Sequence, residues 1–293
     1  MDTSAFSRFV RSPLFMSEPG ESVHCELCHN NCIIKNGCFG SCRVRGNKSG
    51  KGIIPFYGFI SALAIDPIEK KPLYHFKPGT QILSIGFAGC NLACPFCQNW
   101  QISQNTNIPG KWMPPEEIIS AALKRDSPSI AYTYSEPLVH IEYLFDCMTL
   151  ARKHGIANVL VTNGSINTKA AGEILKLTDA VNVDLKCFSE ETYKKILRGD
   201  LQTVLDFIEH CYRTGIHMEI TTLIVPDLND SEDELSAAAD FIARLDREIP
   251  WHLTAYHPDY RWNAPPTNPG FIKNAVKEAE KKLRYVHTGN IRV

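Results

Sequence analysis

Six short apolar runs that alternate with segments of helical period constrain the fold of this chain more than any other feature of its sequence. The runs are QILSIGF (81–87), SIAYTY (129–134), ANVLVT (157–162), AVNVDL (180–185), HMEITTLIV (217–225) and WHLTAY (251–256). Helical segments are expected near 115–125, 138–154, 168–177, 201–214 and 231–246. Strands that alternate with helices predict a parallel sheet. A doubly wound sheet and a curled partial barrel both fit this alternation.

Polar residues follow the ends of these runs and bear on that choice. They are Ser135 and Glu136, Thr162 and Asn163, Asp184 and Lys186, and His257. In a barrel, the loops after the strands meet at one mouth, where (β/α) enzymes build their active sites. We therefore predict an α/β fold, a partial (β/α)6 TIM-like barrel, with an active site at the carboxyl ends of its strands.

Composition narrows the class of protein. The chain has 293 residues, of which 44% are hydrophobic, enough for one large core with a small appendage. Its formal charge of −1 gives no broad basic field, so nucleic acid is not an expected partner. The first 24 residues lack the apolar core of a signal peptide, and no window approaches the ~20 apolar residues of a membrane span. These features predict a cytoplasmic protein that does not enter a membrane.

Eleven cysteines divide the chain into parts. In a reducing compartment they stay thiols, so clusters of them favour metal binding over disulfides. We expect a lead-in at 1–24, a Cys-rich metal-binding module and connection at 25–75, and the barrel with a C-terminal extension at 76–293. The scattered Cys147, Cys187 and Cys211 are expected to be small buried residues.

Three cysteines, Cys90, Cys94 and Cys97, stand in the stretch GFAGCNLACPFCQNW (86–100). A structural zinc site takes four protein ligands, so three thiols leave one position open. An iron–sulfur cube has four corner irons, and three cysteines leave one iron available to a ligand that is not protein. The glycines and proline of this stretch suit a loop that wraps closely around inorganic sulfide. The spacing therefore indicates a three-cysteine cluster site.

The C-x3-C-x-Φ-C pattern, with Phe96 before its last cysteine, resembles the signature of radical S-adenosylmethionine (SAM) enzymes. The resemblance implies a [4Fe-4S] cluster whose open iron binds the amino and carboxylate groups of SAM. It also implies reductive cleavage of SAM to a 5′-deoxyadenosyl radical, which abstracts hydrogen from a substrate. A reducing electron donor of the flavodoxin or ferredoxin type would then be a partner.

Further motifs resemble those of pyruvate formate-lyase activating enzymes. YSEP (134–137) is similar to their Gly-Gly-Glu element, VTNG (161–164) to their Asp-Thr-Asn-Gly turn and VDLK (183–186) to their Asp-x-Lys element. The resemblance implies that Phe96 and Asn99 flank the adenine and that Ser135 and Glu136 bind the ammonium. Lys186, which belongs to the same Asp-x-Lys element as Asp184, would bind the SAM carboxylate. Thr162, Asn163 and His257 would line the rest of SAM. Val161 replaces an aspartate of the family, and Ser135 replaces a glycine.

A longer resemblance, from about residue 23 to 290, is to the radical SAM enzyme of the AmmeMemoRadiSam system. It is carried by CELCHNNCIIKNGCFGSCRVRGN, DPIEKKPLYHFKPGTQILSIGFAGCN, CPFCQNWQISQ, YHPDY and YVHTGN. The resemblance implies Memo-like and AMMECR-type proteins as candidate partners, and it names no substrate.

The N-terminal cysteines offer a second site. The family pattern C-x2-C-x3-C-x9-C selects Cys25, Cys28, Cys32 and Cys42 and leaves Cys38 as a spare. Four thiolates suit either structural zinc or a saturated auxiliary [4Fe-4S] cluster. Either metal would supply folding energy to a segment too short for a core of its own.

These observations predict a radical SAM enzyme that acts on a small molecule or on a protein substrate. A glycyl radical enzyme activase is the alternative. A catalytically inactive zinc-binding scaffold or redox sensor is a minor alternative, which the three-cysteine loop and the polar strand ends oppose.

Overall fold

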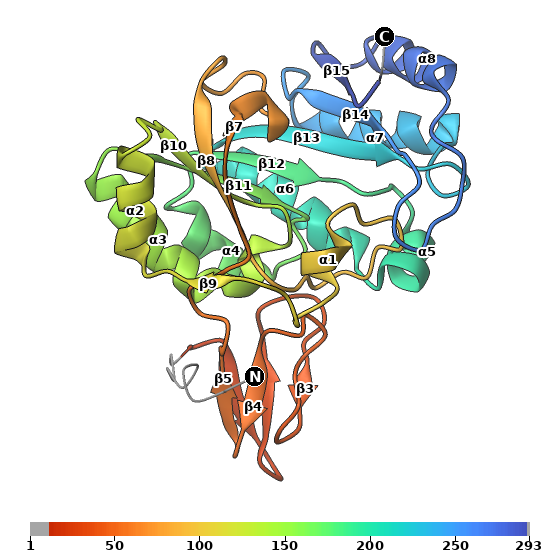
Figure 1. The fold of residues 1–293 in the computed structure, drawn as a ribbon. Helices are drawn as coiled ribbons and strands as arrows, with labels where there is room; N and C mark the ends of the chain where they lie inside the picture. Colours follow the sequence, from red (N-terminus) through yellow and green to blue (C-terminus); the bar gives the residue numbers. More distant parts are fainter. Residues whose placement is uncertain (1–11, 292–293) are drawn as a thin grey trace.

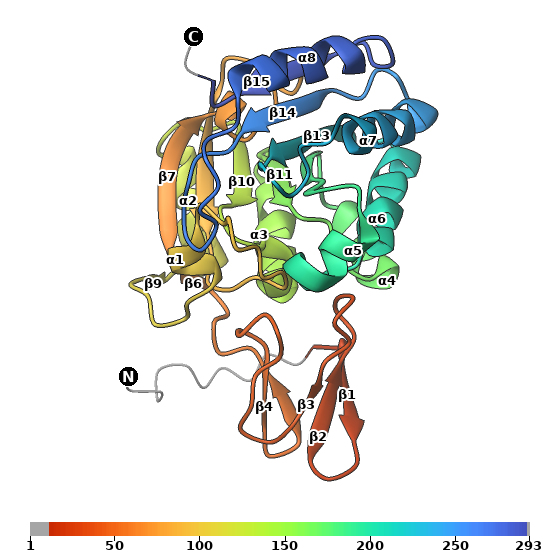
Figure 2. The same ribbon diagram turned by 90° about the vertical axis from the view of Figure 1, so that its right-hand side faces the viewer.

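The main sheet of this computed structural model, which describes residues 12–291, is a curled partial barrel (Figures 1 and 2). Its order is β15-β14-β13-β12-β11-β10-β8-β7. The strands are β7 (Ala62–Pro67), β8 (Gln81–Gly86), β10 (Ser129–Thr133), β11 (Ala157–Thr162), β12 (Ala180–Asp184), β13 (His217–Ile224), β14 (Trp251–Ala255) and β15 (Val286–Gly289). All neighbouring pairs are parallel except β7 with β8. The predicted partial TIM-like barrel is confirmed, with β15 and β7 added beyond the six expected strands.

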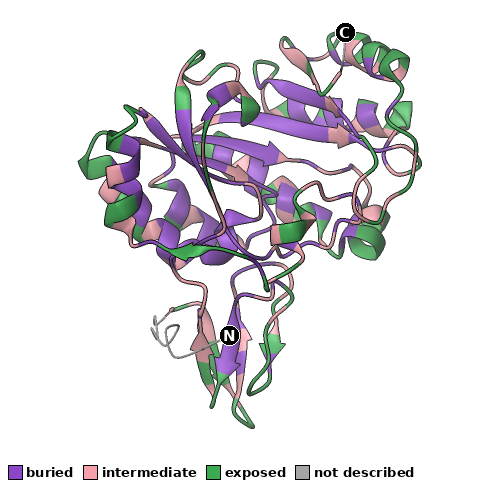
Figure 3. Cartoon of the chain, in the orientation of Figure 1, coloured by how far each residue is buried: buried purple, intermediate pink, exposed green. Residues whose placement is uncertain are grey.

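Helices cover the outer face of the sheet, and the strands lie mostly buried inside them (Figure 3). They are α2 (Pro115–Leu123), α3 (Ile141–Lys153), α4 (Thr168–Leu175), α6 (Leu201–Thr214), α7 (Glu232–Leu245) and α8 (Pro269–Ala279). Shorter helical segments are η2 (Ile68–Lys70), α1 (Trp100–Ser103), η3 (Pro137–His140), α5 (Glu190–Thr192) and η4 (Tyr193–Leu197). Helix α6 shows the amphipathic pattern clearly, because it buries Val204, Phe207, Ile208 and Cys211 at i, i+3, i+4 and i+7.

The three scattered cysteines belong to this core. Cys147, Cys187 and Cys211 are all at most 2% exposed. The prediction that they are small buried residues is confirmed.

The N-terminal segment forms small antiparallel sheets beyond one end of the barrel (Figures 1 and 2). They are β1 (Phe15–Glu18), β2 (Ser22–Cys25) and β3 (Ile33–Ile34) in one sheet, and β4 (Gly46–Lys48) with β5 (Lys51–Ile53) in another. β6 (Phe59–Ile60) pairs with β9 (Lys111–Trp112). Of the expected lead-in, residues 1–11 lie outside the described residues. The expected boundary at residue 25 falls inside β2, and residues 62–67 of the expected connection pair with the main sheet.

A buried ion pair fastens this N-terminal segment to the barrel. The two terminal guanidinium nitrogens of Arg45, Nη1 and Nη2, donate to the Glu142 carboxylate of α3 at 2.7 and 2.8 Å. Arg45 is 1% exposed, so burial alone would lower its pKa, but Glu142 outweighs burial and raises it. Because the pair is bidentate, it sets the orientation of the segment as well as its contact with the helix.

Buried Glu219 links the segment after η2 to β13 and β14 at the amino end of the barrel. Its carboxylate accepts hydrogen bonds from the backbone N–H groups of Tyr74 and His75, at 3.0 and 2.8 Å. His252 Nε2 and His217 Nε2 lie 2.7 and 3.0 Å from it. These contacts attach residues 71–75, which follow β7 and η2, to β13 and β14. Although burial of Glu219 opposes its charge, these hydrogen bonds lower its pKa to about 2.

Replacing Glu219 by Gln should lower the free energy of unfolding at pH 7 by roughly 3 kcal/mol, the linkage value of that shift. A carboxyl whose folded pKa is depressed contributes stability above its unfolded pKa of 4.5 and loses it as the pH falls toward 2. Urea unfolding at pH 7 therefore measures the full contribution. The matched control is Glu173→Gln, which removes an exposed ion pair with Lys176 and should cost less than about 0.5 kcal/mol. Equal losses in the two variants would contradict the role given to Glu219.

Candidate functional site

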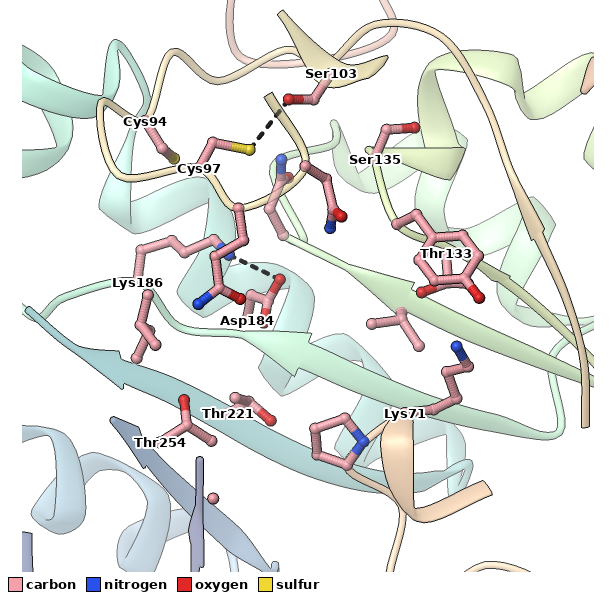
Figure 4. Close-up of a pocket in the computed structure, with 18 of the residues that line it drawn as sticks. Lys71, Cys94, Cys97, Ser103, Thr133, Ser135, Asp184, Lys186, Thr221 and Thr254 are labelled. Carbon is pink, nitrogen blue, oxygen red and sulfur yellow. Dashed lines mark hydrogen bonds and ion pairs between the residues drawn. The ribbon is translucent and has the colours of Figure 1, made fainter. Parts of the chain in front are cut away.

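The three cysteines of the central motif line one cavity of about 580 Å³ at the carboxyl ends of the strands. Figure 4 shows Cys94 and Cys97 on the same side of it. Within residues 12–291, no fourth cysteine lines this cavity. Burial raises the pKa of the Cys94 thiol to about 12, and the pKa of Cys90 also lies well above its ordinary value. Buried thiols of this kind become thiolates when a metal replaces their protons.

Hydrogen-bond donors surround the cysteine sulfurs. The Leu92 N–H donates to Cys90 Sγ at 3.4 Å, and Asn163 Nδ2 donates to the same sulfur at 3.7 Å. Ser103 Oγ lies 3.1 Å from Cys97 Sγ. Such donors stabilise thiolate ligands of iron–sulfur clusters. The donor set, three soft thiols with nearby N–H and O–H groups, fits an iron–sulfur cluster held by three cysteines.

As placed, no group of three or more His, Cys, Asp or Glu side chains in the described part of the chain could hold one metal ion. A cube-shaped cluster makes a different demand, because each cysteine binds its own iron.

Neighbouring segments hold the loop in its shape. His140 Nε2 contacts the Ala88 carbonyl at 2.7 Å, and the Gly89 N–H donates to the Ile102 carbonyl at 2.8 Å. Gly89 has φ +83°, and a Cβ there would lie 2.5 Å from the Cys42 carbonyl oxygen. The cysteine loop therefore packs directly on the N-terminal cysteine segment.

Glu136 joins two strand ends beneath the loop. Its carboxylate accepts from the Thr162 hydroxyl at 2.7 Å and from the Asn163 N–H at 2.8 Å. The Leu138 N–H donates to it at 3.0 Å. Burial raises the pKa of Glu136 to about 7, although these hydrogen bonds act in the opposite direction. The carboxyl group thus fixes the ends of β10 and β11 relative to each other.

Asp184 and Lys186 form an ion pair of 2.8 Å at the end of β12 (Figure 4). Burial disfavours the Lys186 ammonium, but Asp184 and Cys94 outweigh burial and raise its pKa. A stable cation therefore lies beside two of the three cysteines, where it can meet an anionic ligand group.

The cavity unites most of the residues that the sequence predicted for the site. Ten of the twelve line it, namely Cys90, Cys94, Phe96, Cys97, Asn99, Ser135, Glu136, Asn163, Asp184 and Lys186. Thr162 is buried beside the cavity, and its hydroxyl donates a hydrogen bond to Glu136. His257 is exposed and lies 3.3 Å from Gln98, which does line the cavity.

The N-terminal cysteines also approach one another. Cys28 and Cys42 are buried near Cys25, and burial raises the pKa of Cys28 to about 12. The Ser41 N–H donates to Cys32 Sγ at 3.4 Å, next to Cys42. Cys38 is exposed.

Sequence reasoning missed residues that reach the site from other directions. Arg43 donates to the Ser103 carbonyl at 2.8 Å, and Asn30 donates to the Asn91 carbonyl at 3.0 Å. Lys71 and Thr221 line the cavity away from the cysteines. The segment DPIEKKPLYHF supported a resemblance, but nothing in its pattern assigned Lys71 to the cavity.

Comparison with known proteins gives a family. The model of the radical SAM superfamily matches residues 84–242. An uncharacterized protein of Methanocaldococcus jannaschii is 42% identical over 288 residues, which cover 96% of this chain and 86% of that protein. The pyruvate formate-lyase-activating enzyme of Clostridium pasteurianum is 28% identical over 189 residues, which cover 61% of this chain and 76% of that enzyme.

Solved structures agree with the fold. A radical SAM methyltransferase from Sphaerobacter thermophilus has a TM-score of 0.57 at 14% identity, covering 73% of this chain and 67% of that one. Streptococcus suis SuiB bound to S-adenosylmethionine has a TM-score of 0.56 at 14% identity, covering 68% of this chain and 48% of that one.

No helix among the described residues is long and apolar enough to cross a membrane.

Replacing Gly89 by Ala should lower the free energy of unfolding by at least about 2 kcal/mol, because the added Cβ meets the Cys42 carbonyl as well as an unfavourable φ. The matched control is Gly155→Ala, which has φ +68° and nothing within 4 Å, so it should lose only about 1 kcal/mol. Urea unfolding of both variants measures the difference. Equal losses would show that the loop does not depend on this contact.

Proposed function

The chain belongs to the radical SAM superfamily and is an enzyme of that type, and on this premise we propose that Cys90, Cys94 and Cys97 hold a catalytic [4Fe-4S] cluster. The observation that carries the proposal is that these three thiols line one cavity with the Glu136 carboxyl group and the Lys186 ammonium. When bound, the cluster and SAM would supply a 5′-deoxyadenosyl radical for hydrogen abstraction from a substrate.

The remaining residues of the cavity would orient SAM. We assign Lys186 to its carboxylate, since this ammonium is a stable cation beside Cys94. Glu136 and Ser135 would accept from its ammonium, whose positive charge would favour the ionised form of the Glu136 carboxyl group. Asn163, Phe96 and Asn99 would line the rest of SAM. Thr162 is proposed to position Glu136, and His257 to act through Gln98.

The substrate is proposed to be a small molecule or a side chain of a partner protein. The similarity to pyruvate formate-lyase activating enzymes supports the alternative, activation of a glycyl radical enzyme. An EPR doublet on such an enzyme after incubation with loaded protein, SAM and reductant would favour that alternative. Full SAM turnover with no doublet would count against it.

Replacing Cys94 by Ala should abolish the formation of 5′-deoxyadenosine under dithionite, because two thiols cannot hold the cube in the geometry that SAM requires. Anaerobic single-turnover assays with chromatographic detection measure this product. The control is Cys211→Ala, which removes a buried thiol from α6 without touching the cavity and should retain SAM cleavage. A Cys94 variant that still produced 5′-deoxyadenosine would overturn the cluster assignment.

We propose a second metal site at Cys25, Cys28, Cys32 and Cys42, occupied by zinc or by an auxiliary [4Fe-4S] cluster. The burial of Cys25, Cys28 and Cys42 near one another supports it, and Cys32 is half-buried where the Ser41 N–H donates to its sulfur. A metal would displace the protons that burial keeps on such thiols. The contact between Gly89 and Cys42 brings this site next to the catalytic loop. An auxiliary cluster there could carry electrons, whereas zinc would stabilise the segment that supports the loop.

Cys28→Ala should release either one zinc or about four irons relative to the wild type, while Cys38→Ala, at an exposed position, should release none. Elemental analysis of iron and zinc, with a sulfide assay, distinguishes the two metals after anaerobic reconstitution. A Cys28 variant with the full metal content of the wild type would contradict a second site.

The proposed partners follow from this chemistry. A flavodoxin- or ferredoxin-type protein would supply the electron. Memo-like and AMMECR-type proteins are proposed from the motifs shared with the AmmeMemoRadiSam group.

A further inference from the structure

A second cationic group lies in the cavity, away from the cysteines. Lys71 is 3% exposed and lines the cavity, and its Nζ lies 2.7 Å from the Asp66 carboxylate. The ammonium also lies 4.3 Å from the centre of the Tyr134 ring. Tyr134 donates its hydroxyl to Asp66 at 2.6 Å. It has φ 69°, a conformation costly for a residue other than glycine, and such strain concentrates at ligand sites.

The position of Lys71 is set by the segment that closes the amino end of the barrel. Asn182 Nδ2 donates to the Pro72 carbonyl at 2.7 Å, and Glu219 accepts the N–H groups of Tyr74 and His75. These bonds fix the backbone directly after Lys71. Its side chain is therefore held at the cavity wall by the fold and by Asp66.

Thr221 of β13 provides an independent observation. It is 7% exposed and lines the same cavity, yet its hydroxyl oxygen has no hydrogen-bond partner. A buried hydroxyl without a protein partner is costly, so this one is available to a group bound in the cavity. Figure 4 shows Lys71 and Thr221 on the side of the cavity opposite Cys94 and Cys97.

We propose that Lys71 and Thr221 bind the carboxylate of a small organic acid, which is the substrate of this enzyme. The inference rests on the proposed function, because it assigns the half of the cavity that SAM would leave open. The Lys71 ammonium has three donors and Asp66 engages one of them, so it can donate to one carboxylate oxygen. The Thr221 hydroxyl can donate to the other.

The free donors and the shape of the cavity favour a carboxylate over a phosphate or a protein loop. Asp66 engages one donor of Lys71, while Lys70 is 68% exposed and the Glu69 carboxylate turns to the Gly79 N–H at 2.7 Å. Val161 and Leu223 add apolar wall for its carbon skeleton. Because Lys71 is almost fully buried, the acid must enter the cavity itself.

The test is anaerobic equilibrium binding to the reconstituted, SAM-loaded protein. The probes are hexanoate and phenylacetate, each compared with its neutral amide. We expect the wild type to bind at least one acid more tightly than its amide by roughly tenfold, the scale of a charge-assisted hydrogen bond. Lys71→Met should abolish that preference, and Lys71→Arg should keep part of it. The control Lys176→Met, at an exposed ion pair on the outside of the barrel, should match the wild type.

Thr221→Val keeps the experiment decisive if loss of Lys71 impairs folding. It removes only an unpartnered hydroxyl, so it should fold normally and weaken binding of the acid by about fivefold. The inference is overturned if the wild type shows no preference for either acid, or if both Thr221→Val and a folded Lys71→Met retain it. Formation of 5′-deoxyadenosine by the wild type is measured in parallel. If it is absent, the proposed function fails; if it is present without acid preference, only this inference fails.

Discussion

The cysteine loop depends on hydrogen bonds with segments outside it, and this dependence links the whole site. His140 contacts the Ala88 carbonyl, Asn30 donates to the Asn91 carbonyl, and Gln104 donates to the Leu92 carbonyl. Further along the loop, the Ala93 N–H donates to the Leu197 carbonyl, and the Arg261 N–H donates to the Pro95 carbonyl. The partners come from the N-terminal segment, α1, η3, η4 and the region after β14. A loop without regular secondary structure can hold three ligands in place only if such partners fix its backbone.

The N-terminal segment is therefore part of the support of the site. Arg43 contacts the segment after the last loop cysteine, and Arg45 is buried against Glu142 of α3. His29 lies 2.5 Å from the Ser165 hydroxyl, and Asn167 donates to the Glu26 carbonyl at 2.7 Å. A metal at Cys25, Cys28, Cys32 and Cys42 would stabilise the segment that makes these contacts. Loss of that metal would then affect the catalytic loop even if no electron passes between the two sites.

The sequence predicted the barrel strands well because buried parallel strands are continuous apolar runs. It missed β15, whose four residues VHTG are partly buried or exposed, and β7, whose exposed residues alternate with partly buried ones and the buried Asp66. The strand ends were informative about the site, since topology alone brings Glu136, Asn163 and Lys186 together. Lys71 could not be predicted in this way, because the turn after η2 brings it in from the amino end. Thr221 also gave no signal, since a threonine inside a strand is ordinary and its lack of a partner shows only in three dimensions.

The amino end of this barrel has two roles that are usually separate. In (β/α) barrels this end generally contributes stability, and the loops at the other end contribute chemistry. Here Glu219 binds the backbone of Tyr74 and His75, which stand three and four positions after Lys71. The contacts that hold residues 72–75 at the amino end therefore also help to place the Lys71 ammonium in the cavity. If Lys71 binds the substrate as proposed, changes in residues 71–75 would alter substrate selection without changing the residues assigned to SAM.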